Sequence, residues 1–204
     1  MKKYIVFILC LCACWLGLSY CAHLRQTRGE ELVTHAYYGD LLEVKNAVEQ
    51  GAPLDYQFTF EDPERQYTFQ TFNALQAAAS GGNEDIILFL LEQDMDIDAP
   101  TPDGWTPLFI AARDGQAEAA KLLIFKGANL NAQTHSGATA LTMAVTQNYP
   151  TEKARLDLLT YMLKRGADPT LEDMYHHTPL YYAQACNNQP VVTLLQEYQA
   201  TAKN

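Results

Sequence analysis

A repeat of 33 residues constrains this chain more than any other feature of its sequence. Leu108 lies 33 residues after Leu75 and 33 residues before Leu141. The unit around Leu108, residues 103–132, reads as a turn, a short helix that begins with Thr-Pro, a glycine break and a longer apolar helix. Thr and Pro are typical of the first positions of a helix. Because one such helix pair cannot bury its apolar side alone, it has to stack against copies of itself.

The same positions recur along most of the chain. Leu108 follows Thr-Pro, and its equivalents follow Asn-Ala at Leu75, Thr-Ala at Leu141 and Thr-Pro at Leu180, while Gly-Ala pairs recur at residues 51–52, 127–128 and 166–167. Over roughly residues 30–198 this pattern resembles the ankyrin repeat family, whose unit has about 33 residues and a Thr-Pro-Leu-His signature. The signature's His is replaced by Phe109, Thr142 and Tyr181.

The resemblance implies an all-α solenoid of about five repeats with short β-hairpin fingers. The repeat domain is expected to cover residues 30–204, with copies near residues 30–55, 72–99, 103–132, 136–170 and 175–200.

Two insertions interrupt the period. One falls within residues 56–71, where aromatic side chains alternate with polar ones around a Glu-Asp-Pro-Glu turn, which predicts a lengthened β-hairpin with an aromatic face. Its aromatic residues are Tyr56, Phe58, Phe60, Tyr67 and Phe69. This face either packs back on copy one or binds a partner. The other insertion, at about residues 148–153, reads as a plain turn-like bulge.

The N-terminal segment reads as an export signal. Lys2 and Lys3 precede an apolar run, and residues 18–21, Leu-Ser-Tyr-Cys, resemble a bacterial lipobox that predicts lipidation of Cys21 after removal of the preceding signal. Simple cleavage and an uncleaved anchor are the alternatives. Residues 22–29 are expected to form a polar tether. Because Ala22 rather than Asp follows the cysteine, the resemblance implies a periplasm-facing lipoprotein of the outer membrane.

Ankyrin arrays usually bind partners with their fingers and with the exposed side of their first helices, and the resemblance transfers this surface to matching positions here. The first-helix positions that carry large or charged side chains are Tyr37, Tyr38, Arg113 and Asp114. The finger positions are Phe72, Trp105, Tyr175 and His177. Together with the aromatic hairpin, these residues form the predicted partner-binding set, because Tyr and Trp provide large contact areas at small entropic cost. For Phe72 and Trp105 the alternative is that they pack between fingers.

The net charge limits the classes of macromolecule that this chain is expected to bind. The chain carries a net charge of −10, and removing Lys2 and Lys3 with the signal leaves −12. Nucleic acid is therefore excluded as a partner, and a basic or mixed-charge protein is favoured. The sequence shows no nucleophile elbow, phosphate loop or recognisable pair of catalytic carboxylates, so we expect no enzymatic activity, no small-molecule substrate and no cofactor. Residues 94–98 and the pair His176-His177 do not complete calcium or zinc motifs.

These features together predict a protein-binding lipoprotein of the bacterial envelope. The sharpest hypothesis is an immunity protein that inhibits a toxic effector in the periplasm. The alternatives are a scaffold that supports a periplasmic enzyme and a structural protein of the envelope.

Overall fold

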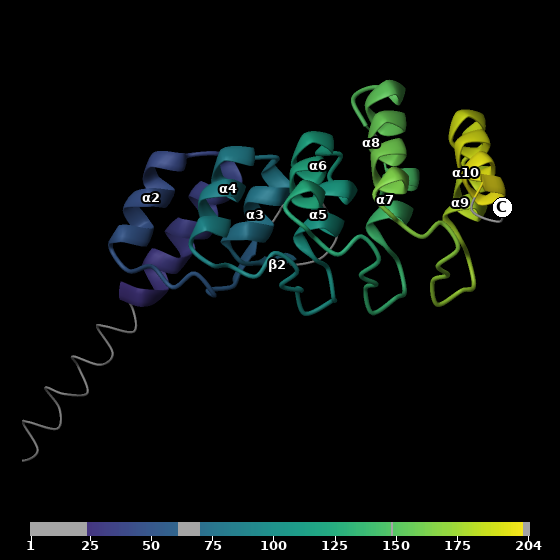
Figure 1. Cartoon of the computed structure of the whole chain (residues 1–204). Coiled ribbons are helices and arrows are strands. Elements are labelled where there is room, and N and C mark those ends of the chain that lie inside the picture. The colour runs from purple at the N-terminus through teal and green to yellow at the C-terminus, as the bar shows by residue number, and fades with distance from the viewer. Residues whose placement is uncertain (1–23, 61–69, 148, 202–204) are drawn as a thin grey trace, which may run out of the picture.

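The structure, a computed structural model, describes residues 24–60, 70–147 and 149–201 (Figure 1). Five pairs of antiparallel helices occupy these ranges and stack side by side along one axis, with loops that project from one end of the pairs. The pairs are residues 24–38 with α2 (Leu41–Glu49), α3 (Ala74–Gly81) with α4 (Glu84–Glu92), α5 (Pro107–Arg113) with α6 (Ala117–Phe125), α7 (Ala140–Thr146) with α8 (Glu152–Lys164), and α9 (Pro179–Ala185) with α10 (Gln189–Thr201). This arrangement confirms the all-α solenoid of five repeats.

The first helix of each later copy begins at a side-chain cap. The hydroxyl of Thr106 accepts the backbone N–H of Phe109 at 3.3 Å, and Thr139 and Thr178 cap α7 and α9 in the same way. Asn73 caps α3 instead, accepting the N–H of Gln76 at 2.9 Å. Each such cap stabilises its helix by about 1 kcal/mol, so the repeating Thr or Asn sets the phase of the array.

The core runs through all five copies along the first helices. Leu75, Leu108 and Leu141 are at most 1% exposed, and alanines beside them let neighbouring helices approach closely. Leu180 is only partly buried. The last copy packs against a neighbour on one side, and no further copy covers its other side in the described residues. The repeating leucine is therefore least buried there.

The segment predicted as a tether is helical from residue 24 onward, so that prediction is wrong for residues 24–29. Arg28 donates from Nη1 to the carbonyl oxygen of Gln50 at 2.6 Å, which ties this part of the helix to the end of α2. The predicted signal, Cys21 and the first two tether residues lie outside the described residues. No helix in the described ranges is both long enough and apolar enough to cross a bilayer.

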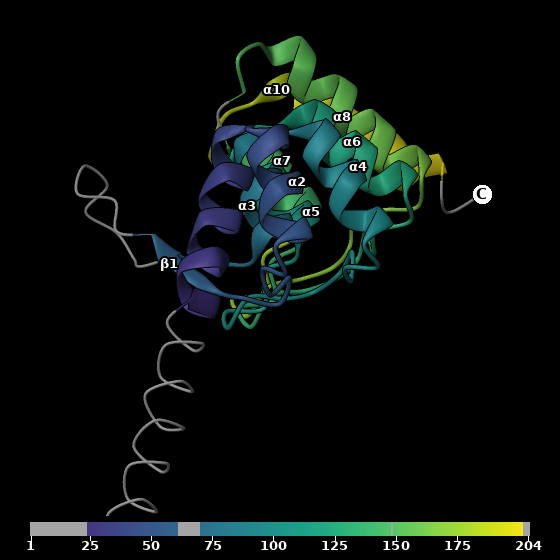
Figure 2. The same cartoon turned by 90° about the vertical axis from the view of Figure 1, so that its left-hand side faces the viewer.

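The lengthened hairpin is present where the structure describes it. Strands β1 (Phe58–Phe60) and β2 (Gln70–Phe72) pair in antiparallel fashion with Phe58 opposite Phe72. The hydroxyls of Thr59 and Thr71 lie 2.9 Å apart. Figure 2 shows that β1 leaves the array in a different direction from the other fingers, beside the helix of residues 24–38. Tyr67, Phe69 and the side chain of Phe60 lie outside the described part.

The second insertion is not a plain bulge. Helix α8 has 13 residues where α4 and α6 have nine, so most of the inserted residues lengthen this helix. Figure 1 shows α8 reaching beyond its neighbours at the edge opposite the fingers. Thr151 caps the longer helix by accepting the N–H of Ala154 at 3.1 Å. The cap explains why the helix begins early, and the sequence Thr-Glu-Lys-Ala was a capping signal that the prediction overlooked.

Candidate protein-binding surface

The ends of the first helices form a connected row across copies one to three. Asn83 donates from Nδ2 to the carbonyl oxygen of Tyr37 at 2.8 Å. The hydroxyl of Ser80 donates to Oδ2 of Asp114 at 2.5 Å, and Gln116 donates to the carbonyl oxygen of Ser80 at 3.0 Å. The structure therefore brings the predicted first-helix positions of neighbouring copies together on one side of the array.

Arg113 is the centre of this row. Its Nε and Nη2 donate to the two carboxylate oxygens of Asp114, each at 2.7 Å. Its guanidinium carbon lies 4.8 Å from the ring centroid of Trp105 and 5.8 Å from that of Phe72. The side chains of Arg113 and Asp114 are only 13% and 16% exposed. Charge, hydrogen bonds and stacking thus fix the guanidinium across the base of the fingers.

Trp105 is held on its other side by α5. Its ring stacks on Phe109 with centroids 5.6 Å apart and an angle of 28° between the planes. Trp105 remains partly exposed, whereas Phe109 is 4% exposed. We call Phe72, Trp105, Phe109, Arg113 and Asp114 the Trp105 cluster. Within it, Trp105 provides the aromatic surface that is open to solvent.

Of the two alternatives for Phe72, partner contact and packing, the structure shows packing. Phe72 was expected to contact a partner from a finger, but its side chain is 2% exposed and belongs to the core. The reason is the pairing of β2 with β1, which turns Phe72 inward beneath Arg113. Phe72 therefore supports the surface and cannot contact a partner directly.

The base of the aromatic hairpin packs back on copy one. The ring of Tyr56 lies against Gly29 in the first helix, and its hydroxyl donates to Glu30 at 3.2 Å. Burial and this hydrogen bond raise the pKa of Tyr56. Phe58 is also partly buried against the core. Of the two alternatives for the aromatic face, packing on copy one describes Tyr56.

Tyr37 and Tyr38 end the first helix and contact each other edge to face at 5.3 Å between ring centroids. Tyr37 is partly buried, whereas Tyr38 is 76% exposed. Tyr38 is therefore the most accessible aromatic side chain at the N-terminal end of the predicted surface that the structure describes.

A second group of aromatic rings lies in the last copy. His177 stacks on Tyr181 with centroids 3.7 Å apart and planes 10° from parallel, and Tyr175 and Tyr182 border the same imidazole. Tyr175 is 65% exposed and Tyr181 is 47% exposed. We call these four residues the C-terminal aromatic cluster. Sequence reasoning selected Tyr175 and His177 but missed Tyr181 and Tyr182.

The sequence contains a feature that marks Tyr181 as a candidate surface residue. Tyr181 occupies the His position of the repeat signature, where Gln76, Phe109 and Thr142 are at most 4% exposed because the next copy covers them. In the last copy that cover is missing from the described residues. An aromatic residue at this position of a terminal copy is therefore a candidate for a surface contact.

The described residues contain no group of three His, Cys, Asp or Glu side chains placed to hold a metal ion. Cys186 is free and exposed on the last copy. The arrangement of the two aromatic clusters is suited to contact with another macromolecule.

Comparison with known proteins agrees with the fold. Residues 32–134 match the family model described as ankyrin repeats (3 copies). The chain belongs to the ankyrin repeat family. It is 33% identical over 118 residues to the B-cell lymphoma 3 protein homolog of Mus musculus. The aligned region covers 57% of this chain and 25% of that protein. It is 25% identical over 183 residues to an ankyrin repeat protein of Fowlpox virus (strain NVSL), covering 87% of this chain and 50% of the viral protein.

A third relative of this ankyrin-repeat protein is Delta-latroinsectotoxin-Lt1a of Latrodectus tredecimguttatus, which is 42% identical over 94 residues, or 45% of this chain and 7% of the toxin. The ankyrin-repeat protein thus spans half or less of the length of these relatives. Ankyrin repeats bind other proteins, so protein binding is the role that the family assigns to the array.

Proposed function

We propose that this ankyrin-repeat protein is an exported, lipid-anchored inhibitor that binds and blocks a toxic effector protein in the bacterial envelope, as an immunity protein does. The observation that carries the proposal is the Trp105 cluster. In it a tryptophan and an arginine are already ordered on one side of a stiff array, between the first helices and the fingers.

Order before binding favours a tight complex. Association costs about 0.5–1.5 kcal/mol for each rotamer-rich side chain that becomes immobilised, and Trp105 and Arg113 are held in the free protein. Trp and Arg are also the residue types that dominate the binding energy of protein interfaces. An inhibitor needs such a surface because it has to stay on its target.

The N-terminal sequence supports the location. An apolar run ending in Cys21 is what a lipoprotein signal requires, and a lipid anchor would confine the inhibitor to the compartment in which it acts. The net charge of −10 supports a basic or mixed-charge partner.

The first test concerns the anchor. The full chain and its Cys21→Ser variant are expressed in bacteria that process lipoproteins. The masses of the mature proteins are measured by mass spectrometry, and their location is determined by cell fractionation. We expect a diacylglycerol-bearing product in the outer membrane that the variant fails to form. A soluble, unlipidated wild-type protein would reject the anchor.

The second test concerns inhibition. Partners are captured with the full chain from the cells that produce it and from their competitors, and each is assayed with increasing amounts of the ankyrin-repeat protein. An inhibitor abolishes the partner's toxic activity at a stoichiometric ratio, whereas a scaffold raises activity or abundance. We expect Trp105→Ala to weaken the complex by 2 kcal/mol or more, on the order of 30-fold, and the exposed control Lys126→Ala to leave it unchanged.

A further inference from the structure

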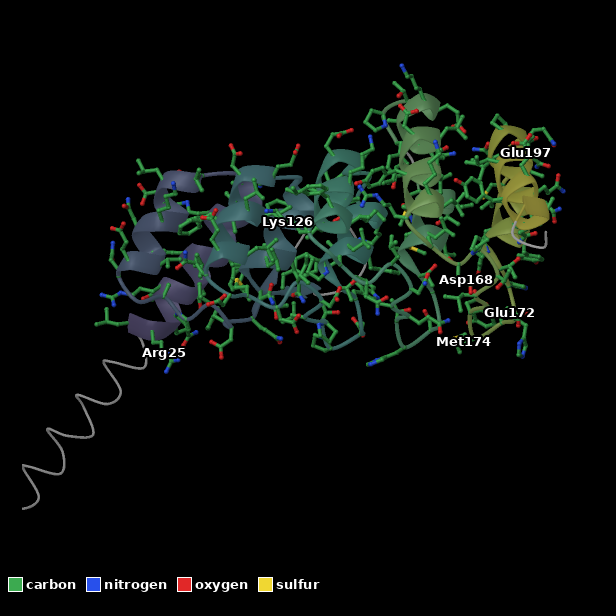
Figure 3. All side chains as sticks on the ribbon, in the orientation of Figure 1. Arg25, Lys126, Asp168, Glu172, Met174 and Glu197 are labelled. Atoms are coloured by element: carbon green, nitrogen blue, oxygen red, sulfur yellow. The ribbon has the colours of Figure 1, made fainter. Side chains whose placement is uncertain are left out.

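The C-terminal aromatic cluster forms a second surface, separate from the Trp105 cluster. Its rings come from the last finger and from α9, and the finger adds Met174, which is 61% exposed. Figure 3 shows Glu172 and Met174 at the tip of this finger, with Asp168 and Glu197 at the same end of the array. Tyr175 and Tyr181 are exposed because no further copy packs on this end in the described residues.

The rings are fixed before any partner arrives. The carboxylate of Asp173 accepts the backbone N–H groups of Tyr175 and His177 at 2.9 and 3.0 Å, and the hydroxyl of Tyr182 donates to its second oxygen. These bonds join the finger to α9. The N–H of Met174 donates to the carbonyl oxygen of Ser136 at 2.8 Å, which also holds this finger against the preceding one.

The charge state of Asp173 follows from the same contacts. Burial favours the protonated acid, but the hydrogen bonds from Tyr182 and from the two backbone N–H groups outweigh it and lower the pKa of Asp173. The hydrogen bond to Asp173 and burial raise the pKa of Tyr182 to about 12. At neutral pH the cluster therefore has a neutral phenol at Tyr182 that is hydrogen-bonded to the carboxylate of Asp173.

The segment that carries this cluster is rich in acidic residues and has no Lys or Arg. Residues 166–201 contain four carboxylates and neither Lys nor Arg. The four are Asp168, Glu172, Asp173 and Glu197. The side chain of Glu172 is 52% exposed, and one of its carboxylate oxygens lies 3.1 Å from Nδ1 of His176. A cation that reaches this end finds exposed tyrosine rings and carboxylates, and residues 166–201 themselves supply no Lys or Arg to compete for them.

We propose that the C-terminal aromatic cluster is a docking site for an arginine-bearing segment of a basic partner protein. A guanidinium can stack on the open face of Tyr181 or Tyr175 while its N–H groups reach Glu172. Arginine fits better than lysine because its planar guanidinium can stack on an aromatic ring and at the same time donate hydrogen bonds to a carboxylate. A second copy of this chain is disfavoured, since it would bring the same carboxylates face to face, and nucleic acid is disfavoured for the same reason.

This inference rests on the proposed function only in that the partner is a protein. It is tested with the full chain in a nonionic detergent, with amide signals recorded by NMR during titration. The probe is a synthetic peptide with three arginines separated by glycines, and lysine and glutamate versions serve as comparisons. We expect shifts centred on residues 172–182, strongest for arginine, absent for glutamate and weakened by salt.

Matched variants locate the site. Tyr181→Leu and Tyr175→Leu change exposed side chains, and each is expected to weaken arginine-peptide binding by about 2–5-fold, the size of one exposed cation–π contact. Tyr38→Leu removes an even more exposed tyrosine at the other end of the array and is expected to leave binding unchanged. Three outcomes would overturn the inference. The arginine peptide does not bind, the glutamate peptide binds equally well, or all three variants weaken binding equally.

A captured partner separates the two proposals. If Trp105→Ala releases the partner while Tyr181→Leu does not, the inhibitor proposal survives and the arginine site is rejected. If both variants weaken the complex, both surfaces contact the partner. If neither does, both are rejected as contact surfaces.

Discussion

Gly29 and Tyr56 form the contact that fixes the aromatic hairpin to the first copy. A Cβ added at Gly29 would lie 2.3 Å from Cγ of Tyr56 and 2.7 Å from both Cδ atoms. These ring atoms are close to the backbone of Tyr56, so a small side-chain rotation cannot move the ring away from the added Cβ. A glycine inside a helix lowers helix stability by about 1 kcal/mol relative to alanine, and here it makes room for the ring.

Gly29→Ala should therefore destabilise the protein despite the better helix propensity of alanine. We expect a net loss of about 1 kcal/mol, because overpacking costs about 1–3 kcal/mol and propensity returns part of it. Urea unfolding monitored by circular dichroism measures the change. In a Tyr56→Ala background the same substitution should become neutral or stabilising. An equal loss in both backgrounds would show that the ring is not the cause.

Single residues also show where sequence reasoning reached its limit. The caps at Thr106, Thr139 and Thr178 could be read directly, because they act on backbone atoms three residues away. The burial of Phe72 could not, because it depends on how β2 pairs with a strand on the other side of an insertion. Local chemistry was predictable, and side-chain orientation set by a nonlocal pairing was not.

At the scale of elements, the insertion in copy four is an ordered part of the fold. Tyr149 donates from its hydroxyl to the carbonyl oxygen of Ala112 in α5 at 2.8 Å. Arg155 donates from Nη2 to the carbonyl oxygen of Gln147 at 2.6 Å and pairs with Glu152 at 3.3 Å. The loop before α8 is thus bound both to its own helix and to the preceding copy.

The hydroxyl of Tyr149 gives this element a measurable pH dependence. Burial raises the pKa of Tyr149 well above its ordinary value of 10.0. The unfolded chain ionises near pH 10 while the folded protein keeps the proton, so the stability from this group is complete below pH 10 and falls as pH rises further.

Tyr149→Phe should remove both the hydrogen bond and this pH dependence. At pH 8 we expect the variant to be less stable by about 1 kcal/mol. The difference should shrink above pH 10 as wild type loses its advantage. The free energy of unfolding of both proteins is measured from pH 8 to 11 in urea. The control Tyr38→Phe should stay within about 0.5 kcal/mol of wild type at pH 8. A difference independent of pH would contradict the burial of the phenol.

Element boundaries show the same division between local and nonlocal signals. The repeat spacing predicted every helix pair, since each repeat has to present the same apolar positions to its neighbours. The alternation of aromatic and polar residues predicted the strand at the start of the aromatic hairpin. The repeat spacing did not predict that the first helix begins at residue 24. Arg28 ties this polar start of the helix to the end of α2. The repeat spacing also did not predict the exposure of Tyr181, which depends on the absence of a further copy over α9 in the described residues.

At the scale of the whole molecule, stability should vary along the array. Within the described ranges, each inner copy packs against two neighbours and copies one and five pack against one. Interactions in such arrays act mainly between nearest neighbours. The inner leucines at 75, 108 and 141 are almost completely buried, and Leu180 is not. Opening of the array should therefore begin at an end.

Hydrogen exchange of the full chain tests this order. We expect the slowest amide exchange in α3, α5 and α7, and faster exchange in α9, α10 and the helix of residues 24–38, because a terminal pair can unfold while the others remain stacked. Leu108→Ala, in the middle, should lower protection in all copies by about 2–5 kcal/mol in opening free energy, whereas Leu195→Ala in α10 should lower it mainly in copy five. Uniform loss of protection in the Leu195 variant would mean that the array unfolds as one unit, and that its two ends cannot respond independently to a partner.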